Sequence, residues 1–459
     1  MAPGKRNGEE QVAWIASCDL PRSPGHPFYD KLNRLLASAD FDRYVEGLCG
    51  PYYDETMGAP SIPPGVYFRM LLIGYFEGID SQRGIAWRCA DSLSLRSFLG
   101  IEPTQAAPDH SSLTRIRQRL PEDLHEAVFQ KVLAMAHERE LLKGRTVGVD
   151  ATLLEANAAM KSIVRKDTGE DYKAYLKRLA EDAGMKDPTD EELRRFDKKR
   201  KGKKMSNDDW QSKTDPDSRV MKMKDGRTHL SYKAEHVLDL ETETILSVGI
   251  SPGDRGDADS LLESLDAAVK NLSGVDEEVG IRDAVADNGY HSVEKLVECD
   301  RRGIRTYIPE SKERKHRVWT DKPEGWRQAF HANRRRWRGR RSRKLQRLRS
   351  ERVERSFAHT CETGAARRSW LRGVVNVFKR YVIHAAAHNL GLMMRKLFGV
   401  GTPRTLQGAP GHDFGLAALV SHVLILIRRL WGVMSGSEDD FDRADSRPSV
   451  PAAILTPAA

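Results

Sequence analysis

The chain has 459 residues, 39% hydrophobic and 31% charged, so it is too long for one ordinary core and two or three domains are expected. Its net charge of +9 is local: eleven of the 75 Lys and Arg residues, but only one of the 66 acids, fall within 331–352. The rest of the chain is nearly neutral, which indicates a docking surface for a polyanion rather than general solubility tuning. Five cysteines without a C-x-x-C pair argue against a zinc site or a disulfide framework and fit a reducing cytoplasm.

Neither end of the chain indicates a membrane protein. Residues 1–24 lack the apolar core of a signal peptide and are expected to be disordered. The most apolar stretch, 416–434, is interrupted by one His and two Arg residues, which favours a buried or partner-facing helix over a membrane span. This stretch belongs to a C-terminal extension, 399–459, that is expected to be partly disordered.

Residues 25–143 are predicted to form an all-helical N-terminal domain. The apolar run 66–76 predicts one helix, and the segment 108–120 predicts another that is capped by Ser111 or Ser112. The polar face of that second helix carries three arginines, Arg115, Arg117 and Arg119. This face is either a solvated surface or a contact for DNA or a partner, and we interpret the domain as one for DNA binding and assembly.

From residue 144 the pattern changes to short strands alternating with helices, which predicts a mixed α/β domain over 144–398. Strands are expected at 146–153, 228–238, 242–250, 281–287 and 305–309, and helices at 257–271, 292–302 and 370–397. A charged, Lys-rich segment at about 160–218 has few apolar anchors. We interpret it as an inserted helix pair with a flexible loop.

Three acidic residues are the main candidates for chemistry. Asp150 and Asp287 each end an apolar strand, and Glu354 lies on a helix whose Val353 and Phe357 would press it against the sheet. Carboxylates in such positions suit two Mg²⁺ or Mn²⁺ ions that cleave a phosphodiester. Taken singly, each has an ordinary alternative: a turn or cap for the aspartates, and a solvated ion pair for Glu354. Glu351 competes with Glu354 for the helical position.

The cationic segment and the residues after Asp287 are the candidate DNA contacts. Arginine matches phosphate geometry better than lysine, and the segment holds ten Arg and one Lys, although a disordered charged linker is the alternative. The candidates are Arg334, Arg335, Arg336, Arg338, Arg340, Arg341, Arg343, Lys344, Arg347, Tyr290 and His291. For Tyr290 and His291 a capping or core role is equally compatible with the pattern.

The chain resembles bacterial insertion-sequence transposases of the Asp-Asp-Glu (DDE) class. The resemblance is carried by the segments 149–157, 286–292, 351–358 and 370–390, together with Pro-Asp-His-Ser-Ser-Leu at 108–113. It implies an RNase H-like mixed β-sheet flanked by helices, with Asp150, Asp287 and Glu354 as the catalytic metal ligands. Part of the family places Tyr, Arg and Lys around the Glu, where this chain has Arg347, Ser350 and Cys361.

The resemblance also implies the reaction and its partners. Water would cleave DNA at the element ends, and the freed 3′-hydroxyl would attack target DNA, with Mg²⁺ or Mn²⁺ as cofactor and a homodimer assembled on DNA. No small-molecule substrate and no membrane are expected. Three alternatives stay open: a metal-dependent nuclease that does not join ends, an inactive DNA-binding regulator, and an RNA-directed nuclease.

Overall fold

The computed structural model describes residues 25–54, 58, 61–201, 206–310 and 318–406. The expectations for 1–24 and for the apolar stretch 416–434 fall outside these ranges. Within them, no helix combines the length and the apolar character that crossing a membrane requires.

The N-terminal region is all-helical, as predicted. Its helices are α1 (Pro27–Ser38), α2 (Phe41–Cys49), α3 (Pro64–Glu77), α4 (Gln82–Asp91), α5 (Leu93–Leu99), α6 (His110–Arg119) and α7 (Glu122–His137), with a short 3₁₀ turn η1 (Gly50–Tyr52). The expected cap of α6 is wrong: Asp109 caps it, and its side chain accepts a hydrogen bond from the Ser111 backbone N–H. Aspartate is as good a cap as serine, so local composition could not separate the three residues.

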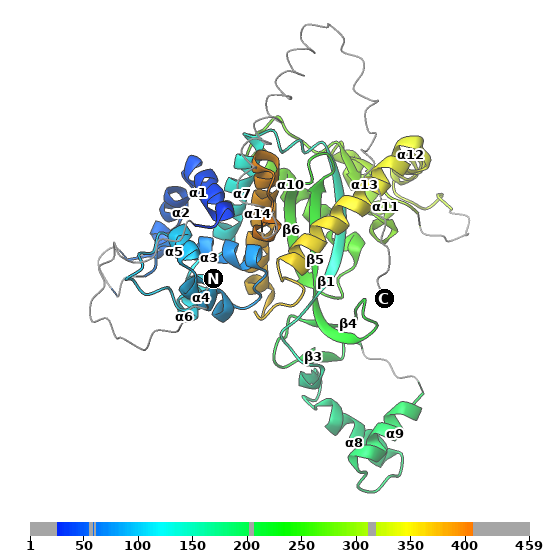
Figure 1. Ribbon diagram of the computed structural model, residues 1–459. Helices are drawn as coiled ribbons and strands as arrows, with labels where there is room; N and C mark the ends of the chain where they lie inside the picture. The colour runs from blue at the N-terminus through cyan, green and yellow to red at the C-terminus, as the bar shows by residue number, and fades with distance from the viewer. Residues whose placement is uncertain (1–24, 55–57, 59–60, 202–205, 311–317, 407–459) are drawn as a thin grey trace, which may run out of the picture. The chain divides into compact units, whose positions relative to one another are not determined.

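The central sheet has the strand order β4-β5-β1-β7-β8, with β6 also paired to β5. Strands β1, β4, β5 and β6 are labelled in Figure 1. The strands are β1 (Thr146–Glu155), β4 (Arg219–Lys222), β5 (Thr228–Asp239), β6 (Ile245–Pro252), β7 (Asp283–Val285) and β8 (Arg305–Tyr307). β5 runs antiparallel to β1, β4 and β6, whereas β7 is parallel to both β1 and β8. The sheet is therefore mixed, as the alternation of strands and helices predicted.

Helices cover both faces of this sheet. They are α10 (Asp257–Ser273), α11 (Val293–Arg301), α12 (Trp326–Arg338), α13 (Arg340–Phe357) and α14 (Val374–Phe398), with the short turns η3 (Asn288–Tyr290), η4 (Ala358–Thr363, a π-helix) and η5 (Pro403–Leu406). On β5, Glu235 accepts a hydrogen bond from Ser260 of α10, whereas the next residue, His236, bonds Ser356 of α13. Because side chains alternate along a strand, α10 and α13 lie on opposite faces.

Helix α14 joins the N-terminal helices to the sheet. It packs against α3 and α7 and also against β6, where the Asn389 side chain bonds both the N–H and the C=O of Ile245 at 2.9 Å. The described residues up to Leu406 accordingly belong to one compact unit. A functional boundary at 143/144 stays a prediction.

The charged insertion contains the expected pair of helices, α8 (Tyr172–Asp182) and α9 (Asp190–Lys199). It also holds a small sheet that was not predicted, formed by β2 (Ile163–Arg165) and β3 (Trp210–Ser212) next to the turn η2 (Met160–Ser162). Helices α8 and α9 pack on each other through their own apolar cluster, Leu176, Ala180 and Leu193. Sequence reading missed the small sheet because each of its strands is only three residues long.

Candidate metal and nucleic-acid site

Asp150 lies on β1, and Asp287 follows the end of β7, the strand parallel to β1. The β1–β7 ladder ends where Gly148 pairs with Val285, and each aspartate follows two residues later in its own segment. The two carboxylates are close enough for the charge of Asp287 to raise the pKa of Asp150. The structure thus brings together two candidates that are far apart in the chain.

Asp150 is partly buried and already has a cationic partner. Its side chain is 22% exposed, and its Oδ2 accepts a hydrogen bond of 2.6 Å from the Nη1 of Arg349 on α13. Burial raises the pKa of the Asp150 carboxyl, while the Arg349 guanidinium and the backbone N–H of Ala151 oppose that shift. The Asp150 and Asp287 carboxylates are close together, and Asp150 already binds the cationic side chain of Arg349. Two such oxygen ligands suit a divalent metal ion.

Asp287 is held by the turn that follows β7. Its Oδ1 accepts a hydrogen bond of 2.8 Å from the backbone N–H of Gly289 and so caps η3. A Cβ atom on Gly289 would lie 3.1 Å from this oxygen and 2.5 Å from Oδ2 of Asp257, the first residue of α10. A side chain at 289 would therefore collide with the two carboxylates that flank it.

Glu354 and Glu351 both lie on α13, the helix that crosses the sheet over β1 and β5 (Figure 1). The predicted anchors of this helix are confirmed: Val353 is fully buried and Phe357 is 7% exposed, with its ring stacked 4.0 Å from that of His236. Gly148 of β1 makes the approach possible, since a Cβ there would lie 3.0 Å from Cγ2 of Val353.

The two glutamates have different partners. Glu354 is exposed and its Oε1 accepts a hydrogen bond of 3.2 Å from Ser350, whereas Glu351 is ion-paired with Arg355 at 2.6 Å. Arg355 also pairs with Glu243, in the connection between β5 and β6. Among the described residues no three His, Cys, Asp or Glu side chains are gathered closely enough to hold a metal, so Glu354 is not drawn in to the aspartate pair.

The arginine-rich segment is helical, in α12 and α13, rather than a linker. Three of its candidate DNA contacts are engaged within the protein: Arg334 pairs with Glu310, Arg341 pairs with Asp283, and Arg336 donates to the Thr306 backbone oxygen. These bonds tie the two helices to β7, to β8 and to the residues that follow it. The other six candidates are exposed and make no ion pair with described residues. We call them the free cation set: Arg335, Arg338, Arg340, Arg343, Lys344 and Arg347.

The DNA-contact prediction for Tyr290 needs correction. Tyr290 is 1% exposed, and its hydroxyl donates a hydrogen bond of 2.8 Å to Oε2 of Glu235, which is also buried. A buried aromatic with a satisfied hydroxyl has a core role. The His291 ring packs edge-on against Phe330 of α12, so its imidazole helps to join that helix to the turn after Asp287.

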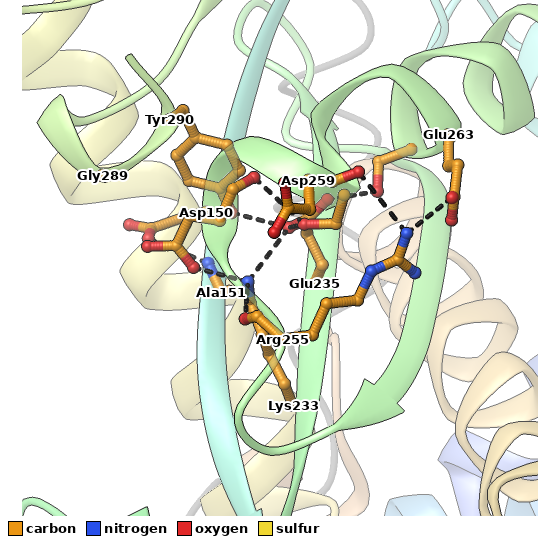
Figure 2. A network of polar contacts seen from close by, with 12 residues as sticks. Asp150, Ala151, Lys233, Glu235, Arg255, Asp259, Glu263, Gly289 and Tyr290 are labelled. Carbon is orange, nitrogen blue, oxygen red and sulfur yellow. Dashed lines mark hydrogen bonds and ion pairs between the residues drawn. The ribbon is translucent and has the colours of Figure 1, made fainter. Parts of the chain in front are cut away.

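Sequence reading did not predict which charged residues lie next to the acidic pair. Arg349 lies one turn before Val353, and that spacing places it on the sheet-facing side of α13, but nothing local separates it from the other arginines. Lys233 and Glu235 stand two apart on β5 and therefore share one face of the strand (Figure 2). Charged residues within an otherwise buried strand were the available signal.

Two family descriptions match this chain. "Transposase domain (DUF772)" matches residues 19–119, and "Transposase DDE domain" matches residues 171–390. The second range contains Asp287 and Glu354, whereas Asp150 precedes it. No curated protein matches the chain. Together the two ranges cover more than half of the chain, and the mixed sheet is the RNase H-like fold that the DDE domain implies. The chain therefore belongs to the DDE-class insertion-sequence transposases.

Proposed function

We propose that this transposase cleaves DNA at the ends of an insertion sequence and joins the freed 3′ ends to target DNA, using Asp150, Asp287 and Glu354 to hold Mg²⁺ or Mn²⁺. The observation that carries the proposal is the proximity of Asp150 on β1 to Asp287 just beyond the adjacent strand β7, close enough for the charge of Asp287 to raise the pKa of Asp150, beside a helix that bears Glu354. Such ions would activate the attacking oxygen and stabilise the leaving oxygen.

The chain's own residues supply orientation and charge. Strand β1 positions Asp150, the turn after β7 holds Asp287, and α13 bears Glu354 beside the buried Val353 and Phe357. Arg349 neutralises Asp150 in the absence of metal, and would be released toward a DNA phosphate when a metal ion takes its place. The free cation set would hold the DNA backbone.

We further propose double-stranded DNA as the partner, both at the element ends and at the target, with a homodimer assembling on it because two ends must be joined. A reaction on chromosomal DNA would take place in the bacterial cytoplasm. Nothing in this scheme requires a small-molecule substrate.

A strand-transfer assay tests the function directly. Protein, Mg²⁺ and a labelled duplex carrying the element end are incubated with a target plasmid, and we expect both a nicked end and a joined product. Cleavage without joining would make the protein a nuclease, and binding without any cleavage in Mg²⁺ or Mn²⁺ would make it a regulator. A parallel RNA–DNA hybrid of the same sequence should be cut less than the DNA duplex; preference for the hybrid would favour an RNA-directed nuclease.

The double variant Arg343→Ala/Arg347→Ala is expected to weaken DNA binding chiefly through phosphate contacts. Both residues are exposed and one turn apart on α13, and neither pairs with another described residue. Each lost phosphate contact lowers the slope of log K against log salt by about 0.9, so the slope should fall by about 2. Fluorescence anisotropy across a salt series measures it.

A matched control removes two arginines whose charges are already paired. Arg195 and Arg301 are each 72% exposed and bond an acid on their own helix, Glu191 and Glu298. Arg195→Ala/Arg301→Ala should leave the salt slope unchanged. Equal salt slopes for the two double variants would show that Arg343 and Arg347 of α13 do not contact DNA phosphates.

A further inference from the structure

A buried polar network lies under the aspartate pair, on the α10 side of the sheet. Lys233 and Glu235 of β5 are each only 4% exposed. Burying two charges costs more free energy than a well-packed apolar pair would, unless their partners are well placed. The contacts of Lys233 and Glu235 join β5 to α10 and to the turn after Asp287 (Figure 2).

Glu235 collects three hydroxyl donors from two separate elements. Its Oε2 accepts hydrogen bonds from the Tyr290 hydroxyl at 2.8 Å and from Ser260 at 2.7 Å, and its Oε1 accepts one from Ser264. The two serines lie on α10, whereas Tyr290 ends the short turn η3. Glu235 thus ties η3 to the sheet and to α10 through one carboxylate.

Lys233 also stabilises the turn η3, through Asp257 at the start of α10. Its Nζ lies 2.5 Å from Oδ1 of Asp257 and donates a hydrogen bond of 3.1 Å to the backbone oxygen of Arg255. The other oxygen of Asp257 lies against Gly289, within the turn that Asp287 caps. Lys233 and Glu235 therefore brace both the start of α10 and the turn.

We propose that Glu235 is a positioning residue for Asp287, acting through the hydroxyl of Tyr290; this inference rests on the proposed function. Strand β7 is only three residues long, and Asp287 lies beyond it, so the ladder does not orient its carboxylate. The anchor at Tyr290, three residues later, holds the turn whose cap is Asp287. Partners that orient a metal ligand typically contribute about 10- to 100-fold to metal affinity.

The test compares two tyrosines that make the same kind of bond. Tyr29 of α1 is 2% exposed, and its hydroxyl donates to Oε1 of Glu77 at 2.7 Å, within the N-terminal helices. Tyr290→Phe and Tyr29→Phe each remove one buried hydroxyl–carboxylate bond, and each protein is titrated with Mn²⁺ by calorimetry, with thermal melting in parallel. We expect Tyr290→Phe to raise the Mn²⁺ Kd about 10-fold and Tyr29→Phe to leave it unchanged, while both lower the melting temperature similarly.

Glu235→Gln is a second, independent variant, because its amide oxygen can still accept the bond from Tyr290. Its Mn²⁺ Kd should fall between those of wild type and Tyr290→Phe, and it carries the test alone if Tyr290→Phe does not fold. Wild-type Mn²⁺ affinity in both Tyr290→Phe and Glu235→Gln would overturn the positioning role. Asp287→Asn distinguishes failure of the positioning role from failure of the proposed metal site. If this variant binds Mn²⁺ as wild type does, the metal assignment in the proposed function fails, and the positioning role fails with it.

Discussion

Asp287→Asn is expected to remove strand cleavage while leaving DNA binding within about 2-fold of wild type. Asparagine keeps an oxygen that can accept the hydrogen bond from Gly289, so the turn η3 should persist and only the charge is lost. Removing a residue that orients a metal ligand lowers metal affinity or activity about 10- to 100-fold. Losing the charge of the ligand itself should therefore lower the cleavage rate more than about 100-fold. Single-turnover cleavage in Mg²⁺ and fluorescence anisotropy on the same duplex measure the two effects.

The control for this variant is the same substitution at an exposed ion pair. Asp266 of α10 pairs with Arg302 at the surface, and its side chain is 57% exposed. Surface pairs contribute little, so Asp266→Asn should keep both cleavage and binding. Cleavage by Asp287→Asn at the wild-type rate would exclude Asp287 from the catalytic set, and parallel loss of cleavage and binding would point to a folding defect.

Glu354→Gln is expected to lower cleavage by more than about 100-fold, whereas Glu351→Gln should change it less than about 3-fold. Both residues lie on α13, and both substitutions remove one negative charge without changing side-chain size. Glu354 bonds only Ser350 among the described side chains, while Glu351 is bound by Arg355. Single-turnover cleavage of the end duplex compares them directly.

The opposite result is equally informative. Loss of cleavage in Glu351→Gln, with Glu354→Gln active, would transfer the third ligand to Glu351 and require α13 to rotate about its axis. Melting temperatures of the two variants should stay close to wild type, since both side chains are exposed. A large drop in either would show that its carboxylate supports the fold.

Local patterns sufficed for most elements of the fold. The apolar run 66–76 and the strand predicted at 228–238 correspond to α3 and β5, and both elements are buried along most of their length. Boundaries were less well determined. The helix predicted from 370 begins at Val374, since Gly373 has φ +81°, outside helical space. The predicted strand 281–287 shortens to β7, because the chain leaves the ladder before Asp287.

The sequence by itself determined which residues could do the chemistry, because acids that end apolar strands and a dense arginine segment are local features. Only the tertiary structure decided which of them meet. The parallel pairing of β1 with β7 joins Asp150 and Asp287, and the crossing of α13 sets Arg349 on Asp150. It also buried Tyr290 against Glu235. Contacts between residues this far apart depend on strand order and helix packing, and neither can be read from the local sequence around each residue.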